Sequence, residues 1–324
     1  MPIKLSTAIE GFMLSCEAAR LSPHTIRDYS VTLRRFAAFV GEDRALASIS
    51  RDDVRRFLRS LAQPQTVTAG VTVRHLERLS DKTILNYHTG LGALWTWAVG
   101  EELVETHLIH QVERPKPETR AVAPLSEKDI KALLTACDKT VRYDRPGKKT
   151  TDNTRPTKLR DRAIVFLMLD TGLRASELCG LAACDVDFKN ARIWVMGKGK
   201  KERFLPMSPD TRAVLWKYLN KDRLDEPASA PLFAMIDGRP MTRVSLLQLL
   251  RRLGERAGVR DVHPHRFRHT FAIQFLRNGG DVYALQAALG HTTLEMVRRY
   301  LQLAQTDIDK AHETASPVAK WRLR

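Results

Sequence analysis

The first 110 residues place their apolar positions three and four apart, which is the spacing of amphipathic helices. In SPHTIRDYSVTLRRFAAFV (22–40), Ser22 is a typical N-cap, and Pro23 suits the first helical position. The apolar positions that share one face of this predicted helix are Ile26, Tyr29, Leu33, Phe36 and Val40. One face of the helix is therefore expected to be buried.

Two later segments repeat this scheme. SRDDVRRFLRSL (50–61) begins with the cap Ser50 and carries Asp52 and Asp53 in its first turn, where the helix dipole favours acidic side chains. SDKTILNYHTGLGALWTWAV (80–99) begins with the cap Ser80. Residues 63–79 show no helical period, and we predict a loop there. The N-terminal part is therefore expected to be a small bundle of about four helices.

The segment VERPKPETRAVAP (112–124) is rich in proline and charge, which suits an extended linker. A chain of 324 residues is also long for a single core. We therefore predict an N-terminal helical domain over 1–111, a linker over 112–124 and a second domain over 125–324.

The second domain changes its period in the middle. A helix capped by Ser126 comes first, and a basic stretch without an apolar face (142–160) is predicted to be a loop that could contact phosphates. Two helices broken at Gly172 follow. Alternating apolar residues between 186 and 205, separated by two turns, predict three antiparallel strands, and helices resume near residue 210. The fold class is mainly α with a small three-stranded antiparallel sheet, an α+β arrangement.

The charge of the chain indicates a polyanionic partner. The net charge is +16, and it lies almost entirely in the second domain. Residues 1–110 hold 13 basic and 12 acidic residues, whereas residues 111–324 hold 40 and 25, a net charge of +15. This excess of positive charge could belong to a basic surface that is merely solvated. Binding to nucleic acid explains it better, because basic side chains neutralise the phosphates.

Other features of the composition narrow the class further. No apolar run reaches the roughly 18 residues of a membrane span, so no membrane partner is expected. The four cysteines, Cys16, Cys137, Cys179 and Cys184, lack the spacing of a zinc site or a disulfide framework. We expect an intracellular protein that holds no metal.

The residues that could do chemistry are individually ordinary. Arg174 and Glu177 could form a local ion pair of a few tenths of a kcal/mol. The lysines of the turn GKGKK (197–201) could simply be solvated. The histidines of HPHRFRHTF (263–271) lack a carboxylate or cysteine at ligand spacing, and Tyr300 alone would be a packing residue.

Together these residues suit attack on a phosphodiester. Two guanidiniums, Arg174 and Arg268, can clamp the non-bridging oxygens and stabilise charge in the transition state. A tyrosine hydroxyl can act as the nucleophile and form a phosphotyrosine, while lysine and histidine can move protons. No acidic cluster suited to two metals is evident. The basic side chains must therefore stabilise the negative charge on the phosphate, as Mg²⁺ does in two-metal enzymes.

The chain resembles the tyrosine recombinases, the phage-integrase-type or Xer-like family, over nearly its whole length. SPHTIRDYSVTLRRFAAFV looks like the first helices of the family's core-binding (SAM-like) domain. The segments that look like the boxes of its catalytic domain are TGLRASELCGL, GKGKKERFLPM, HPHRFRHTFA and LGHTTLEMVRRY. The spacings also match: 24 residues from Arg174 to Lys198, 23 from Arg268 to His291 and nine from His291 to Tyr300.

The resemblance implies a role for each residue. Arg174 and Arg268 bind the scissile phosphate, and His291 hydrogen-bonds it. Lys198 protonates the 5′-hydroxyl leaving group, and His265 assists as acid or base. The attack by Tyr300 leaves a 3′-phosphotyrosyl enzyme, and Glu177 orients Arg174.

The resemblance also implies the reaction and the partners. The function implied is site-specific cutting and rejoining of DNA, in integration, excision or resolution, without ATP, metal or other cofactor. The implied partner is double-stranded DNA at paired specific sites, clamped by both domains. The enzyme would self-associate on DNA as a tetramer, with the tail after Tyr300 packing on a neighbouring subunit.

Some alternatives stay open. HPHRFRH contains His-x-x-Arg twice, as His263–Arg266 and as His265–Arg268; the spacing to the next box favours the second. Lys200 and Lys201 share the turn with Lys198. A DNA-binding relative without catalytic activity and a type IB topoisomerase are the competing functions.

Binding to DNA is expected to weaken steeply with salt, because phosphate contacts release condensed counterions. Between about 50 and 200 mM salt the affinity should fall by roughly 10³-fold or more. Gel-shift titrations of duplex DNA at several salt concentrations measure this, and a flat dependence would contradict the charge argument.

Overall fold

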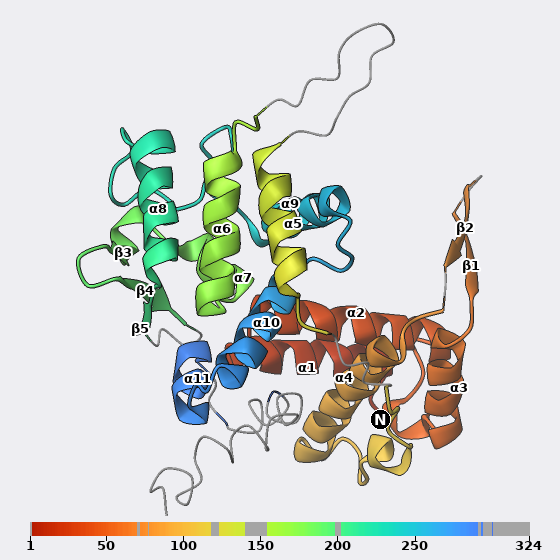
Figure 1. Ribbon diagram of the computed structural model, residues 1–324. Coiled ribbons are helices and arrows are strands. Elements are labelled where there is room, and N and C mark those ends of the chain that lie inside the picture. Colours follow the sequence, from red (N-terminus) through yellow and green to blue (C-terminus); the bar gives the residue numbers. More distant parts are fainter. Residues whose placement is uncertain are drawn as a thin grey trace, which may run out of the picture. The chain divides into compact units, whose positions relative to one another are not determined.

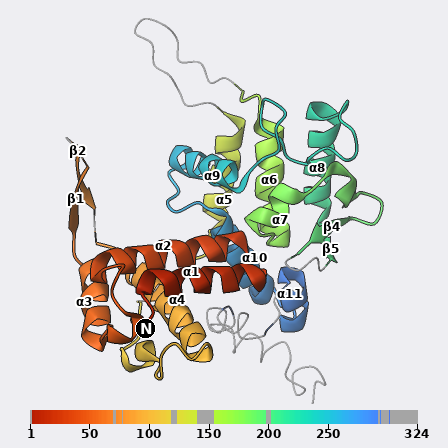
Figure 2. The same cartoon turned by 180° about the vertical axis from the view of Figure 1, so that it is seen from behind.

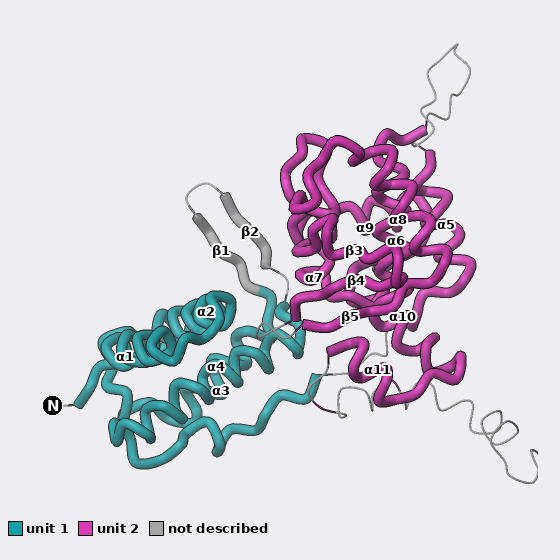
Figure 3. The backbone as a smooth tube through the Cα atoms, turned by 90° about the vertical axis from the view of Figure 1, so that its left-hand side faces the viewer, with its two compact units in different colours: residues 1–121 teal, residues 122–324 magenta. Residues whose placement is uncertain are grey.

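The computed structural model describes residues 2–69, 72–76, 78–117, 123–139, 154–197, 202–290, 293 and 300; within 65–76 it describes the backbone only. The chain divides into two compact units, residues 1–121 and residues 122–324 (Figure 3). This division falls inside the Pro-rich stretch 112–124. Each unit has its own apolar core.

The first unit is a helical bundle, drawn from red to orange in Figure 1. Its helices are α1 (Leu5–Ala18), α2 (Pro23–Val40), α3 (Arg51–Leu61) and α4 (Asp81–Gly100), with short 3₁₀ turns at Leu46–Ser48 and Leu108–Gln111. The side chains of Ser22, Ser50 and Ser80 accept hydrogen bonds from the backbone N–H groups of Thr25, Asp53 and Thr83. The predicted caps are therefore confirmed, because each serine satisfies an amide that the helix leaves without a partner.

Aromatic residues fill the core of this bundle. Phe36 of α2 packs edge-to-face against Phe57 of α3 and Trp95 of α4, with ring centroids 5.1 and 6.1 Å away. All three side chains are at most 1% exposed. Because each ring comes from a different helix, their contacts fix how α2, α3 and α4 pack.

The prediction of a loop over 63–79 was wrong. The backbone forms two antiparallel strands, β1 (Gln65–Ala69) and β2 (Thr72–Leu76), with Ala69 opposite Thr72. The run QTVTAGVTVRHL contains the β-branched residues that favour strands. The absence of a helical period was therefore evidence for strands as much as for a loop.

The second unit, coloured from yellow to blue, contains mostly helices and has a small sheet at its edge (Figures 1 and 2). Its helices are α5 (Glu127–Asp138), α6 (Lys158–Thr171), α7 (Ala175–Gly180), α8 (Pro209–Asp222), α9 (Arg243–Ala257), α10 (Pro264–Arg277) and α11 (Val282–Leu289). Its strands are β3 (Val186–Asp187), β4 (Arg192–Met196) and β5 (Glu202–Pro206), paired antiparallel in that order. The predicted fold class is thereby confirmed.

Helix α6 lies at the centre of this unit. Its residues Ala163, Ile164, Val165, Leu167 and Met168 are at most 1% exposed, and it contacts α5, α8 and α10. In the sheet, Ile193 and Val195 of β4 and Leu205 of β5 turn inward to the same core, as alternation along a strand requires. The register of the strands therefore determines which side chains of the sheet face the core.

The predicted loop over 142–160 was wrong at its C-terminal end. Residues 158–160 are the first turn of α6, and the carboxylate of Asp161 is fully buried there. Arg155 and Arg160 donate to it at 2.7 and 2.8 Å. These basic residues are therefore structural; residues 140–153 lie outside the described part of the chain.

Within the described ranges, no helix is both long and apolar enough to cross a membrane. All four cysteines are free: Cys16 and Cys137 are buried, Cys179 is half-buried and Cys184 is exposed.

Replacing Asp53 by Asn should destabilise the first unit at neutral pH by about 2 kcal/mol, because a buried, charge-assisted cap is lost. Its carboxylate is 4% exposed and accepts hydrogen bonds from Arg44, Arg56 and Ser50. Hydrogen bonds from Arg44 and Ser50 hold the pKa of Asp53 below its usual value.

A lowered pKa contributes stability above the unfolded-state pKa, about 3.9, and this contribution is lost as the pH falls toward the folded value. The difference in free energy of unfolding between wild type and Asp53→Asn should therefore shrink between pH 5 and pH 3. Denaturant unfolding at both pH values measures it. Asp52→Asn is the matched control, because Asp52 is exposed and pairs only with Arg55 at the surface; equal effects of both variants would contradict the prediction.

Candidate active site

Arg174 begins helix α7. Helix α6 ends at Gly172, which adopts a left-handed conformation (φ +62°), and the chain then turns into α7 with Arg174 as the N-cap. Glu177 accepts a hydrogen bond from the backbone N–H of Arg174 at 2.9 Å and from its Nη1 at 2.8 Å. The predicted local ion pair is thus also the cap of the helix.

Glu177 binds a second arginine, Arg203 of β5, which the sequence analysis did not single out. Nη1 and Nη2 of Arg203 donate to Oε1 and Oε2 of Glu177 at 3.1 and 3.0 Å. Burial alone would raise the pKa of Glu177, but hydrogen bonds and charge from Arg203 and Arg174 lower it. Glu177 is therefore a carboxylate that remains ionised although its side chain is only 4% exposed.

Arg268 reaches the same place from helix α10 and is only 3% exposed. Its Nη1 donates to the carbonyl of Gly172 at 2.9 Å, and its Nη2 donates to the carbonyl of Leu289 at 2.7 Å. Burial, together with the nearby charge of Arg174, lowers the pKa of Arg268 to about 10. The guanidinium thus stays charged at neutral pH, in a place where a further negative charge would stabilise it.

The C-terminal end of α11 holds the three guanidiniums together. Its last carbonyls, those of Ala288, Leu289 and Gly290, accept hydrogen bonds from Arg203 (3.0 Å), Arg268 (2.7 Å) and Arg174 (3.3 Å), respectively. A helix leaves these carbonyls without intrahelical partners, and its dipole makes this end attractive to cations. Gly290 has a left-handed conformation (φ +60°), which is typical of a residue that ends a helix.

His265 lies on the first turn of α10, near Arg268 and Arg174. Partial desolvation of its ring, together with the charges of Arg268 and Arg174, lowers the pKa of His265. At neutral pH the ring is therefore uncharged and can accept a proton. His263 instead caps α10 by accepting from the backbone N–H of Arg266, and Arg266 itself binds the carbonyls of Ala123 and Arg260.

Tyr300 is 7% exposed and belongs to a small apolar cluster between α10 and α11. Its ring lies 5.5 Å from that of His269, and its phenol is close enough to Arg268 to influence the pKa of that guanidinium. The structure therefore brings Arg174, Glu177, His265, Arg268 and Tyr300 into one region. Lys198 and His291 lie outside the described residues, as do Lys200 and Lys201.

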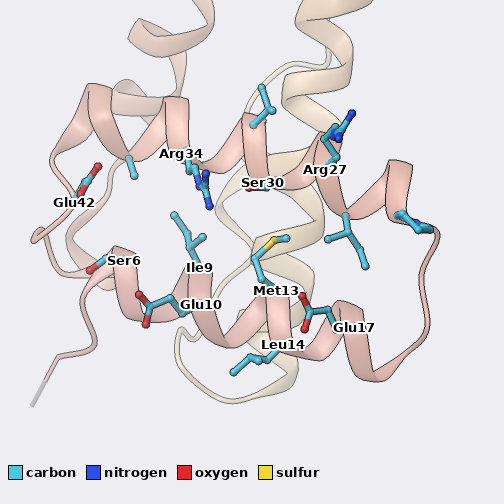
Figure 4. Close-up of a pocket in the computed structure, with 14 residues that line it drawn as sticks. Ser6, Ile9, Glu10, Met13, Leu14, Glu17, Arg27, Ser30, Arg34 and Glu42 are labelled. Atoms are coloured by element: carbon cyan, nitrogen blue, oxygen red, sulfur yellow. The ribbon is translucent and has the colours of Figure 1, made fainter. Parts of the chain in front are cut away.

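A groove of about 970 Å³ lies between α1 and α2 of the first unit (Figure 4). Ile9 and Met13 extend into the space between the two helices, and Arg27 and Arg34 of α2 lie across it from the acidic residues of α1. Its lining includes none of the predicted site residues. In the part of the chain that the structure describes, no group of three or more His, Cys, Asp and Glu side chains could hold a metal ion.

Comparisons with known proteins identify the family of the chain. Residues 123–307 match the phage integrase family, and residues 9–105 match the phage integrase N-terminal SAM-like domain. The tyrosine recombinase XerC of Pelobacter propionicus is 31% identical over 98% of this chain and 97% of its own length. That of Staphylococcus carnosus is 30% identical over 96% and 97%. The chain therefore belongs to the phage integrase family of tyrosine recombinases.

Solved structures share the fold. The integrase of the transposon Tn1549, in complex with a circular intermediate DNA, is 19% identical and has a TM-score of 0.73 over 95% of this chain and 99% of its own. The XerH site-specific recombinase, bound to a palindromic difH substrate in a post-cleavage complex, is 21% identical and has a TM-score of 0.68 over 92% of this chain and 82% of its own.

Gly172→Ala should destabilise the second unit by more than a left-handed conformation alone costs, because a neighbouring side chain already fills the space that the added Cβ needs. A Cβ at Gly172 would meet Phe271 at 2.4 Å. Gly238→Ala is the matched control, since Gly238 also has a positive φ (+80°) but open space around it. We expect a loss of about 1 kcal/mol for the control and about 3 kcal/mol for Gly172→Ala. Thermal unfolding measures both, and equal losses would show that the contact with Phe271 is unimportant.

Proposed function

We propose that this chain is a site-specific DNA recombinase that cuts and rejoins DNA strands through a phosphotyrosine at Tyr300. The observation that carries the proposal is the convergence of Arg174 and Arg268 on one end of α11, in a member of this family, with Tyr300 in the adjoining cluster. Three guanidiniums meet there around the carboxylate of Glu177. Such an excess of positive charge favours a bound anion, and the phosphodiester of DNA supplies one.

Arg174 and Arg268 bind the non-bridging oxygens of the scissile phosphate. Attack creates a pentacoordinate transition state with more negative charge on these oxygens than the substrate has. Guanidiniums that are already oriented stabilise that charge without further reorganisation. His291, next to Gly290, is the third residue that we assign to the phosphate.

Tyr300 attacks phosphorus through its hydroxyl oxygen. The new bond joins this oxygen to phosphorus, the bond from phosphorus to the 5′ oxygen breaks, and the 3′ end stays covalently attached. We assign the uptake of the proton from the Tyr300 hydroxyl to His265, whose pKa is lowered by burial and by the charges of Arg268 and Arg174. Lys198 gives a proton to the departing 5′ oxygen, which leaves as a hydroxyl group.

The phosphotyrosine keeps the energy of the broken bond. The 5′-hydroxyl of another strand can therefore attack phosphorus and release Tyr300 without ATP. Exchange of strands needs two paired DNA sites and more than one copy of the enzyme. We propose a tetramer in this synapse, with each chain clamping duplex DNA between the domains 1–111 and 125–324.

Duplex DNA is the substrate that the charge of the chain supports, since the net charge is +16. The Tn1549 integrase and XerH were both solved with DNA, which also supports this choice. A DNA substrate in a bacterial cell would place the protein in the cytoplasm at the nucleoid. Integration, excision and resolution are the processes that this chemistry can serve.

A covalent adduct tests the proposal. Duplexes that tile the DNA flanking the gene are nicked near candidate sites, mixed with protein in EDTA without ATP, and denatured in detergent. Peptide mass spectrometry then locates any attached nucleotide. We expect the adduct on Tyr300 and its loss in Tyr300→Phe. Tyr283→Phe, a change at a 68% exposed tyrosine of α11, should leave it unchanged.

Other outcomes favour the competing functions. Tight, salt-sensitive binding to a defined sequence without an adduct would favour a DNA-binding relative that does not cut. An adduct on Tyr300 with DNA of unrelated sequence, together with relaxation of supercoils, would favour a type IB topoisomerase. Salt-sensitive binding by Tyr300→Phe equal to that of wild type would show that the variant is folded.

A further inference from the structure

We propose that Arg203 is a positioning residue for strand cleavage, which holds Arg174 through Glu177 and fixes the end of α11. This inference rests on the proposed function, because it assigns to Arg203 the support of the phosphate-binding guanidinium. Arg203 is not one of the residues that we propose contact DNA or transfer a proton.

The register of the sheet directs Arg203 inward. In β5, Leu205 is buried in the core of the second unit, and Arg203 lies two residues before it, hence on the same face. Arg203 pairs with the buried Val195 of β4. An arginine at an inward position needs partners, because an unpaired buried charge is costly. Its side chain is 14% exposed, and all three of its nitrogens donate to protein oxygens.

Arg203 and Arg174 share both oxygens of Glu177. Oε1 accepts from Nη1 of each arginine, and Oε2 accepts from Nη2 of Arg203 and from the backbone N–H of Arg174. Rotation of the carboxylate would therefore break bonds to both arginines at once. Arg203 thus locks the orientation of Glu177, and Glu177 in turn fixes the guanidinium of Arg174.

The third bond of Arg203 reaches helix α11. Its Nε donates to the carbonyl of Ala288 at 3.0 Å, two residues before Gly290. A Cβ at Gly290 would lie 3.3 Å from the guanidinium carbon of Arg203, so the two residues are in close contact. Arg203 therefore ties strand β5 both to Arg174, through Glu177, and to the C-terminal end of α11.

This arrangement predicts a loss of rate rather than of DNA binding. Without Arg203, Glu177 keeps Arg174 as a partner but can rotate, and Arg174 loses its fixed direction. Misplacement of a catalytic group by about 1 Å can cost roughly 10²-fold in rate. The net positive charge changes by a single unit, so affinity for duplex DNA should change little.

The test uses the full chain and a nicked duplex of the sequence that forms the adduct on Tyr300. We expect Arg203→Ala to form the adduct about 10²-fold more slowly at saturating DNA and to bind the duplex within about threefold of wild type. Arg203→Lys keeps the charge but loses the bidentate contact with Glu177, and it should recover only part of the rate of adduct formation. Arg192→Ala is the matched control: it removes an arginine from an exposed position of β4 in the same sheet and should keep the wild-type rate.

A double-mutant comparison separates positioning from general loss of structure. In an Arg174→Lys background, Arg203→Ala should slow adduct formation much less than it does alone, because both changes damage the same clamp. A substrate whose 5′-bridging oxygen is replaced by sulfur needs no acid for its leaving group. This substrate should not restore the rate of adduct formation by Arg203→Ala, because Arg203 positions the arginine that binds the phosphate and does not assist the leaving group.

Several results would overturn the inference. These are a wild-type rate in Arg203→Ala, full additivity with Arg174→Lys, or restoration by the sulfur substrate. If Arg203→Ala does not fold, the same criteria apply to Arg203→Lys. Wild-type protein that forms no adduct would instead contradict the proposed function itself, so the two failures are distinguishable.

Discussion

The repulsion between three guanidiniums at one point is the constraint on which the site depends. Arg174, Arg203 and Arg268 lie close enough to influence one another, and burial with the charge of Arg174 lowers the pKa of Arg268 to about 10. In a medium of low polarity such charges repel strongly unless they are paired. Glu177 and the carbonyls at the end of α11 supply this pairing before any substrate arrives.

Four separate elements must meet for this pairing to exist. Helix α7 brings Arg174 and Glu177, β5 brings Arg203, α10 brings Arg268, and α11 brings the carbonyls. Gly172 makes the turn between α6 and α7, and its own carbonyl holds Arg268. The small sheet therefore contributes to the site, because the register of its strands directs the side chain of Arg203 toward Glu177.

Local signals predicted most of the fold and the class of site. Serine caps, the break at Gly172 and the alternation of the three strands are properties of short segments, and the structure agrees with them. The hairpin over 65–76 was missed because its β-branched residues were given less weight than the missing helical period. Arg203 was missed because its partners lie 26 and 85 residues away in the chain. Its signal was nevertheless present, since it stands on the same face as Leu205 and would need a carboxylate there.

The two arginines that we propose bind the phosphate are held differently. Arg268 is 3% exposed and donates at 2.7 and 2.9 Å to two carbonyls, so both ends of its guanidinium are anchored. The side chain of Arg174 is 35% exposed, and its bond to Gly290 is 3.3 Å long, which is weak for a charged donor. An arriving phosphate can therefore replace the carbonyl of Gly290 on Arg174 at little cost, whereas Arg268 keeps its place. We propose that Arg268 defines where the phosphate binds, while Arg174, held through its Nη1 by Glu177, exchanges only the carbonyl bonded to its Nη2 for a phosphate oxygen.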